Sequence, residues 1–410
     1  MTTPGSSDSP PASRSRRWFL GLGAVFTGLL AACRSSDPGE TPSLLGRPVS
    51  PYGSRSRFET SVRDPRASRA PESASSRTPL QDSVGIITPA ALHFERHHGG
   101  VPDIDPDGHR LMIHGLVQRP LVLTLDDLRR LPSVSRIHFL ECSGNGSSEW
   151  RQPTGRDAQQ IHGLTSCSEW TGVSLRMLLD ECGIRPEASW IVAEGADACK
   201  MTRSVPLSKV RDDVLVAYGQ NGEALRPEQG YPLRLLVPGW EGNISVKWLR
   251  RIKVVDQPYM TREETSKYTD LMPDGTARQF TFMMEPKSLI TRPSPGHHLD
   301  GPGFHEISGL AWSGQGVIER VEISTDGGAR WQDAELQAPV LPIAHTRFRL
   351  GWTWDGRERI LQSRCTDEAG YCQQPREALV AVRGFNSNYH NNAIQSWRLR
   401  TDGTLENAHA

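Results

Sequence analysis

The chain has no excess of either charge, because 47 lysines and arginines are matched by 47 aspartates and glutamates. Without a basic excess or an acidic run, its charge indicates neither a nucleic-acid partner nor a solvating tail. The sequence also contains no C-x-x-C-H motif, so it predicts no haem attached to this chain. Pairs of C-x-x-C motifs typical of structural zinc are missing as well. Any metal must therefore be held by another arrangement.

The apolar run over residues 19–32 is too short to predict a membrane span. Arg16 and Arg17 directly precede it, and charged, apolar and then small residues are the order of an export signal. The paired arginines favour a twin-arginine signal over 1–35 rather than an ordinary secretory signal. The run ends in L-A-A-C at Cys33, which resembles a lipoprotein processing box, so lipidation and ordinary cleavage both stay open. We therefore expect a periplasmic protein, either free or lipid-anchored.

The remaining length is more than one typical domain requires, and its texture changes twice. Residues 36–85 are rich in Ser, Arg and Pro, which predicts a flexible linker. Residues 86–285 combine short helical patterns with apolar strand-like runs, which predicts a mixed α/β domain. Residues 286–410 consist of short strands with turn signals such as D-G-G, and they predict an immunoglobulin-like β-sandwich. The expected fold class is α+β.

Local signals predict two helices. Thr124 can cap a helix that Pro132 ends, and the spacing of apolar residues over 174–182 predicts a second helix that stops at Gly183. Cys182 lies on the apolar face of this second helix, so we expect it in the core.

Four of the other cysteines have structural interpretations. Cys167 and Cys199 have no partner at metal-binding spacing, and we expect both to be structural. Cys365 and Cys372 bracket a turn-like stretch and could form a local disulfide, but the spacing does not decide their redox state.

Cys142 has different surroundings. It ends an apolar stretch and opens the turn C-S-G-N-G. Packing, a disulfide and nucleophilic attack are the alternatives, but no local motif supplies a histidine base for a nucleophile. The glycines allow close approach of the backbone, and turn N–H groups can face an anion. A thiolate ligand for a soft or high-valent metal fits this setting better.

Several segments place polar or cationic groups at the ends of strand-like runs: F-E-R-H-H (94–98), A-E-G-A-D (193–197), Y-P-L-R (231–234) and S-V-K-W-L (245–249). Taken singly, each fits an ordinary solvated or structural residue. Taken together, they supply cations and hydrogen-bond donors for a large anionic cofactor.

The order of these motifs over about residues 88–400 resembles the sulfite oxidase family of molybdenum–molybdopterin enzymes. The E-C-S-G-N-G turn, the paired arginines of the export signal and T-R-E-E-T-S-K-Y (261–268) resemble its sulfane dehydrogenase branch. The resemblance implies a molybdopterin-binding domain over 86–285 and a dimerisation domain over 286–410.

The resemblance also assigns residues to roles. It implies Cys142 as the thiolate ligand to molybdenum, Arg96 as a substrate-pocket arginine and Tyr268 as a tyrosine beside the metal. The implied pterin contacts are Phe94, Arg96, His97, His98, Asp197, Gln229, Arg234, Ser245, Val246 and Lys247. Two of these depart from the family pattern, in which Asn is common where His97 stands and His is common where Gln229 stands.

Two further departures concern the substrate. Sulfite oxidases commonly carry an arginine where Ser147 stands, and often another near the end of the segment that here reads A-W-S-G-Q-G-V (311–317), with Gln315. Because arginines suit the small sulfite dianion, their loss favours a substrate with less free charge, such as sulfane sulfur on a protein cysteine.

As partners, the resemblance implies a dihaem c-type cytochrome that accepts electrons, a sulfur-carrier protein as substrate, and a second copy of the chain bound through the C-terminal domain. The expected activity is oxidation of protein-bound persulfide within thiosulfate oxidation. The alternatives are a sulfite dehydrogenase on the same fold, a reductase that repairs methionine sulfoxide, and a non-catalytic surface lipoprotein.

Overall fold

The structure is a computed structural model that describes residues 46, 48–66 and 68–409. The predicted export signal over 1–35 and Cys33 therefore lie outside the described residues. Residues Ser61–Ala410 form one compact unit, separate from Met1–Thr60, and this unit contains every helix and strand named below. Within the described part, no helix is both long and apolar enough to cross a bilayer.

A three-stranded antiparallel sheet begins this unit. Its elements are β1 (Asp64–Arg66), β2 (Ser75–Arg77) and β3 (Glu95–Arg96), with the 3-10 turns η1 (Leu80–Asp82) and η2 (Ala90–Leu92) between the last two strands. The composition of residues 36–85 predicts a solvated linker, but the part from β1 onward is folded. Hydrogen bonds hold it where apolar residues are few: Gln159 Nε2, for example, donates to the carbonyl oxygen of Arg77 at 2.9 Å.

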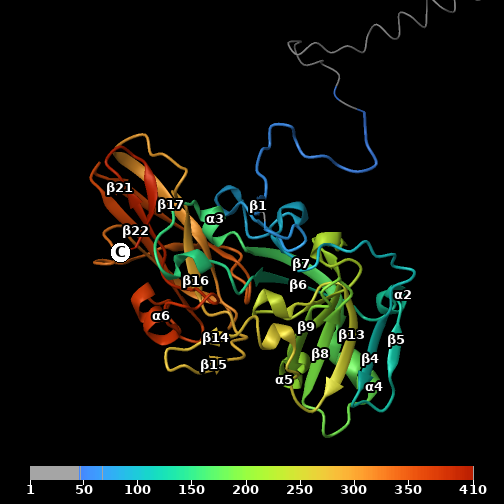
Figure 1. Ribbon diagram of the computed structural model, residues 1–410. Coiled ribbons are helices and arrows are strands. Elements are labelled where there is room, and N and C mark those ends of the chain that lie inside the picture. Colours follow the sequence, from blue (N-terminus) through green and yellow to red (C-terminus); the bar gives the residue numbers. More distant parts are fainter. Residues whose placement is uncertain (1–45, 47, 67, 410) are drawn as a thin grey trace, which may run out of the picture. The chain divides into compact units, whose positions relative to one another are not determined.

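Two five-stranded sheets form the centre of the first domain (Figure 1). In spatial order, the first contains β5 (Leu121–Leu123), β4 (Leu111–Gly115), β13 (Leu249–Val255), β8 (Trp190–Gly195) and β9 (Thr202–Pro206). The second contains β11 (Glu223–Ala224), β10 (Leu215–Gln220), β7 (Thr165–Ser174) and β6 (Val134–Glu141), with β12 (Arg234–Leu236) also paired to β10. Only the β13–β4 pair is parallel among these ladders.

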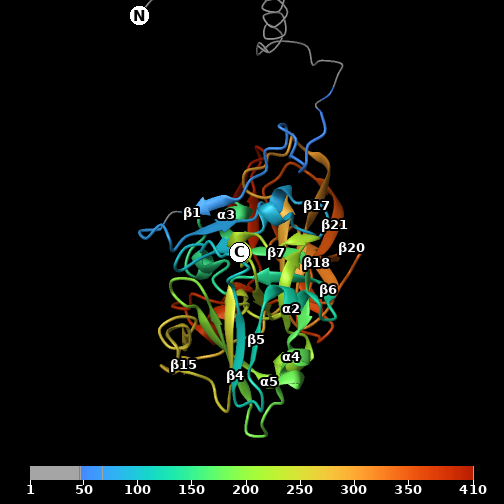
Figure 2. The same ribbon diagram turned by 90° about the vertical axis from the view of Figure 1, so that its right-hand side faces the viewer.

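The first domain has four short helices: α2 (Leu125–Arg129), α3 (Ala158–His162), α4 (Leu175–Cys182) and α5 (Leu207–Asp212). Helices α2 and α4 contact β7 and α5 contacts β9, whereas α3 contacts β2 and η1. Thr124 caps α2 as predicted, because its Oγ1 accepts from the backbone N–H of Asp127 at 3.0 Å. Helix α4 confirms the second predicted helix, with Gly183 as its C-cap residue. Figure 2 shows α4 and α5 on the same side of β4 and β5.

The C-terminal part is a two-sheet β-sandwich, as predicted. One sheet contains β16 (Lys287–Arg292), β17 (Gly303–Trp312), β21 (Thr346–Trp354) and β20 (Glu335–Gln337); the other contains β19 (Gln332–Asp333), β18 (Ile318–Ser324), β22 (Arg359–Asp367), β23 (Ser396–Leu399) and β24 (Leu405–Ala408). The hairpin β14 (Asp270–Leu271) and β15 (Ala277–Arg278) precedes it, and α6 (Arg376–Arg383) follows β22. A mixed α/β domain followed by a β-sandwich confirms the α+β class.

The structure shows the burial and the bonding state of four other cysteines. Cys182 is buried on α4 and Cys167 is buried on β7, so both occupy core positions as expected. Cys365 and Cys372 are both free thiols. Burial raises the pKa of Cys365 well above its ordinary value.

One buried carboxylate joins the two domains. Glu141, the last residue of β6, accepts hydrogen bonds from Lys287 Nζ (3.1 Å), Asn145 Nδ2 (2.8 Å) and Trp312 Nε1 (2.7 Å). Lys287 also donates to the carbonyl oxygen of Asn391 at 2.7 Å. Both members of the ion pair are almost fully enclosed, since Glu141 and Lys287 are each 1% exposed.

We predict that Lys287→Met lowers the free energy of unfolding by about 3 kcal/mol, because it leaves the Glu141 carboxylate buried without its counter-ion. Urea denaturation measures the change. Arg349→Gln is the matched control, because it breaks the exposed pair with Glu335 on the neighbouring strand and should cost less than about 1 kcal/mol. Equal effects of the two substitutions would show that the buried pair does not hold the domains together.

Candidate active site

One cavity gathers every residue that the resemblance assigns to the site. Its lining includes Phe94, Arg96, His97, His98, Cys142, Asp197, Gln229, Arg234, Ser245, Val246, Lys247 and Tyr268. These residues lie at or near the ends of several different strands and turns. Residues 94–98 surround β3, Asp197 follows β8, and residues 245–247 lie between the turn η5 (Gly242–Ile244) and β13. The proximity is a finding, while the individual roles stay predictions.

Cys142 lies in a tight turn directly after β6. Its backbone N–H donates to the carbonyl oxygen of Leu164 at 2.9 Å, and its own carbonyl oxygen accepts from the N–H of Asn145 at 2.9 Å. Gly146 completes the turn with a φ of 77°, in the left-handed region that favours glycine. Burial raises the pKa of the Cys142 thiol, and this is opposed by a backbone hydrogen bond at Gly144 and by the charge of Arg96.

Lys247 contributes a cation to the wall of this cavity. Its Nζ donates to the carbonyl oxygens of Arg96 (3.2 Å) and Glu228 (3.0 Å) and to His97 Nδ1 (2.8 Å). Burial, together with the nearby charge of Arg234, lowers the pKa of Lys247 well below its ordinary value. Within the described residues, none of its hydrogen bonds goes to a carboxylate.

Arg234 contributes a second cation, and it is only 4% exposed. Its Nη1 donates to the backbone oxygen (3.3 Å) and to the side-chain oxygen (3.1 Å) of Gln229. Its Nε is enclosed and lacks a hydrogen-bond partner among the residues that the structure describes. Burial lowers the pKa of Arg234 to about 9. A buried guanidinium with a free donor is costly, so the cavity is suited to an anion.

His97, which stands where the family commonly has Asn, connects Lys247 to an acidic residue. While Nδ1 accepts from Lys247, Nε2 lies 2.7 Å from Glu95 Oε2. Burial alone would raise the pKa of Glu95, but the hydrogen bond from His97 and the charge of Arg63 lower it to about 2. Both ring nitrogens of His97 are thus used within the protein, and His97 orients Lys247.

Gln229, which stands where many members have His, is buried at the end of the turn η4 (Pro227–Gln229). Its Nε2 donates to the carbonyl oxygen of Phe94 at 2.9 Å, while its oxygen accepts from Arg234. The side chain therefore holds Arg234 against the loop that follows Phe94, whatever contact it makes with a cofactor.

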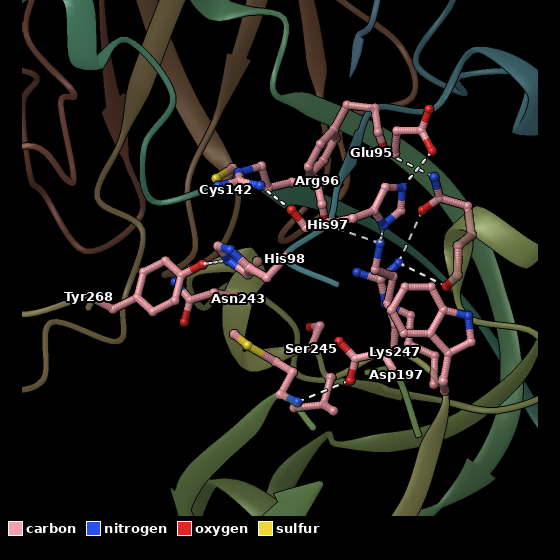
Figure 3. Close-up of a pocket in the computed structure, with 17 residues that line it drawn as sticks. Glu95, Arg96, His97, His98, Cys142, Asp197, Asn243, Ser245, Lys247 and Tyr268 are labelled. Carbon is pink, nitrogen blue, oxygen red and sulfur yellow. Dashed lines mark hydrogen bonds and ion pairs between the residues drawn. The ribbon is translucent and has the colours of Figure 1, made fainter. Parts of the chain in front are cut away.

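A second cavity of about 470 Å³ adjoins the first. Cys142, Arg96, His98 and Tyr268 line both of them. Figure 3 shows Cys142, His98 and Tyr268 at one side of the first cavity and Lys247 and Asp197 at the other. A metal at Cys142 would therefore lie where the two cavities meet.

His98 and Tyr268 are in direct contact, with 2.6 Å between His98 Nε2 and the phenol oxygen. Burial and the charge of Arg96 lower the pKa of His98 to about 4, and burial raises the pKa of Tyr268. The neutral phenol therefore donates to the neutral imidazole. Arg203, which is buried, packs over the Tyr268 ring with its guanidinium 5.3 Å from the ring centre.

The two substrate-related departures occupy different places. Ser147 lines the second cavity beside Gly144, so an arginine is missing from that wall. Gln315 is exposed, and neither Gln315 nor Val317 lines either cavity.

Sequence reasoning missed part of the lining. In the first cavity these residues are Glu95, Met201, Gly242, Asn243 and Trp248; in the second they include Ser73, Ser75, Arg77, Arg262, Lys267 and Tyr389. Glu95 and Trp248 lie inside quoted motifs and could have been found there. The segment 73–77 carries no motif, and only its pairing with β3 reveals it.

Two family models match the chain: "Oxidoreductase molybdopterin binding domain" over residues 98–263 and "Mo-co oxidoreductase dimerisation domain" over residues 278–397. Mitochondrial sulfite oxidase of Rattus norvegicus is 31% identical over 344 residues, which cover 78% of this chain and 60% of the relative. Nitrate reductase [NADH] of Ulva prolifera is 32% identical over 310 residues, which cover 66% of this chain and 34% of the relative. The chain thus spans only part of these relatives.

Among solved structures, the sulfane dehydrogenase SoxCD from Paracoccus pantotrophus matches with a TM-score of 0.88 and 47% identity, covering 92% of this chain and 100% of that chain. Fold, cavity and matches define a molybdopterin-binding domain joined to a dimerisation domain. The chain belongs to the sulfite oxidase family of molybdopterin oxidoreductases, in its sulfane dehydrogenase branch.

Its cofactor is molybdenum–molybdopterin, and the donors of the first cavity fit this group. The enclosed, unpartnered Nε of Arg234 and the cation of Lys247 suit the phosphate of the pterin. Cys142 supplies a sulfur donor at the opposite side of the cavity, and soft thiolates bind metals of this kind.

We predict that Lys247→Met lowers the molybdopterin content per chain at least about tenfold, because a charge-assisted contact to the phosphate is lost. Cofactor release and fluorescence of the oxidised pterin measure the content. Lys253→Met on β13, the strand that follows Lys247, is the control, because Lys253 packs over Tyr259 outside the cavity. Equal content in the two variants would contradict the assignment of Lys247.

We predict that Cys142→Ser removes one sulfur from the ligands of molybdenum, because the hydroxyl replaces the thiolate. X-ray absorption at the molybdenum edge counts these sulfur ligands. Cys199→Ser serves as control: Cys199 donates to Asp197 Oδ2 at 2.6 Å beside the first cavity without lining it. An unchanged sulfur count in Cys142→Ser would rule out Cys142 as the ligand.

Proposed function

We propose that the protein is a periplasmic molybdenum oxidoreductase that oxidises sulfane sulfur bound to the cysteine of a carrier protein. The observation that carries this proposal is the 47% identity over 92% of the chain to the sulfane dehydrogenase SoxCD, against 31% identity to the rat sulfite oxidase. The size of the second cavity supports it, because about 470 Å³ is more room than a small free oxyanion needs.

When bound, the cofactor supplies two-electron oxygen-atom chemistry at sulfur. In each step a persulfide R–S–S⁻ and one water give R–S–SO⁻, two protons and two electrons. The side chains around Cys142 would bind the substrate and exchange protons with it. Arg96 faces both cavities and would bind the anionic end of the sulfur group. Tyr268, held neutral and bonded to His98, can exchange a proton at its phenol oxygen.

The two electrons must leave through a partner, because the sequence contains no motif for covalent haem. A c-type cytochrome with two haems is the proposed acceptor, and the similarity to the sulfane dehydrogenase SoxCD supports a partner subunit of this kind. The dimerisation domain supports assembly of two copies of the chain through the C-terminal sandwich. Export through the twin-arginine route, with or without a lipid at Cys33, would place the enzyme beside such partners.

A sulfite dehydrogenase is the second candidate. The absence of an arginine at Ser147 argues against it, but other cations line the same cavity: Arg77, Arg96, Arg262 and Lys267. The charge of the cavity therefore distinguishes persulfide from sulfite less sharply than the missing arginine alone would. The size of the cavity and the sequence identity to SoxCD favour the persulfide.

We predict that the protein, purified with its cytochrome partner, reduces haem rapidly with a carrier protein that bears a cysteine persulfide and at least about a hundredfold more slowly with sulfite. Stopped-flow absorbance of the haem measures both rates, with Cys142→Ser as the blank. Efficient reduction by sulfite at low micromolar concentration would make the protein a sulfite dehydrogenase. Reduction by neither donor would contradict both candidates.

A further inference from the structure

The strand β2 supplies a wall of the second cavity. Ser73, Ser75 and Arg77 are every second residue of this segment, and all three line the cavity. The alternate residue Ser76 is buried on the opposite face, where its Oγ donates to Glu95 at 3.0 Å. The alternation of the strand therefore directs Arg77 at the space beside Cys142.

The neighbouring strand carries the substrate-pocket arginine. In the β2–β3 ladder, Ser75 lies opposite Arg96, so Arg77 and Arg96 enter the same cavity from adjacent strands. In the part of the chain that the structure describes, Arg96 donates to three neutral groups, which are the carbonyl oxygens of Ala74 and His97 and the hydroxyl of Ser73. Both arginines therefore keep their charge available to the cavity.

Among the described residues, Arg77 forms no ion pair, although the charge of Asp64 lies close enough to act on its pKa. Its Nε and Nη1 are enclosed and make no hydrogen bond to the residues that the structure describes. Asp64, which lies opposite Arg77 on β1, instead pairs with Arg66 at 2.9 Å. Burial and the charge of Arg66 lower the pKa of Arg77 from its ordinary value. Enclosed guanidinium donors without a partner are costly unless an anion completes them.

Arg77 differs from the other two cations of this wall, Arg262 and Lys267, in its burial and in its partners. Arg262 forms an ion pair with Glu263, through Nε–Oε1 at 2.8 Å. Lys267 is exposed, whereas Arg77 is half-buried. Arg77 is therefore the enclosed cation that stands beside Arg96 with its donors unused.

We propose that Arg77 binds the anionic sulfur group of the substrate together with Arg96, and so takes the place of the arginine that is missing at Ser147. The ligand class is a sulfur oxyanion or a terminal persulfide anion, which the fork of a guanidinium binds through two parallel hydrogen bonds. The identity of the natural substrate rests on the proposed function, whereas anion binding by Arg77 does not.

Inorganic sulfate tests the proposal without turnover. In the holoenzyme the first cavity holds the cofactor, so calorimetric titration reports sulfate at the second. Arg77→Gln should weaken sulfate binding about tenfold, because a charge-assisted bidentate contact is lost. Arg156→Gln is the matched control: Arg156 is exposed, lies close enough to affect Arg77, and does not line the cavity.

Arg77→Lys keeps the charge but not the fork, so it should retain binding that is weakened severalfold; it also serves if Arg77→Gln does not fold. The same sulfate affinity in wild type, Arg77→Gln and Arg77→Lys would overturn the proposal. So would an equal loss in Arg156→Gln, because that would indicate a general effect of charge.

Turnover separates this proposal from the proposed function. With the substrate that reduces the cytochrome, Arg77→Gln should raise KM about tenfold and leave kcat within about threefold, since the contact binds the substrate before and during reaction alike. A fall in kcat at unchanged KM would contradict a binding role. If neither persulfide nor sulfite is oxidised but sulfate binding still depends on Arg77, only the proposed function fails.

Discussion

The Glu141 carboxylate is the interaction on which the arrangement of the site depends. It immediately precedes Cys142 and is bonded at once to the turn through Asn145 and to the sandwich through Lys287 and Trp312. Because both charges are enclosed, neither can move away without losing its partner in a poorly solvated place. The position of the thiol is therefore fixed by the contact between domains as well as by its own loop.

The cofactor cavity shows the opposite balance, since Lys247 and Arg234 form no ion pair with a carboxylate among the described residues, although Glu95 and Asp197 line the same cavity. Carbonyl oxygens and His97 orient Lys247, and Gln229 orients Arg234. These hydrogen bonds fix the positions of the two side chains but do not balance their positive charges. Such a site gains stability when an anion binds to the folded chain and not to the unfolded one. Cofactor insertion and folding are then coupled through the same few side chains.

The sequence predicted the fold class because capping residues, strand periodicity and D-G-G turns are local signals, as at Thr124 and Gly183. The residues around the first cavity could be assigned through contiguous motifs such as 94–98 and 245–249. Arg77 and Arg203 could not, because a strand pairing places the first and a ring contact in the fold defines the second. The folded part of 36–85 escaped for a related reason: side-chain and backbone hydrogen bonds hold it where apolar residues are sparse.

The two sets of cations lie on separate parts of the chain. Arg234 begins β12 and Lys247 lies between η5 and β13, whereas Arg77 comes from the short N-terminal strand β2, where Arg77 and Ser75 line the second cavity and not the first. Substitutions in β2 can therefore alter that wall while the cofactor loops keep their sequence. Members of a family with this arrangement can therefore differ in substrate through changes in β2 while they keep the same chemistry at the metal.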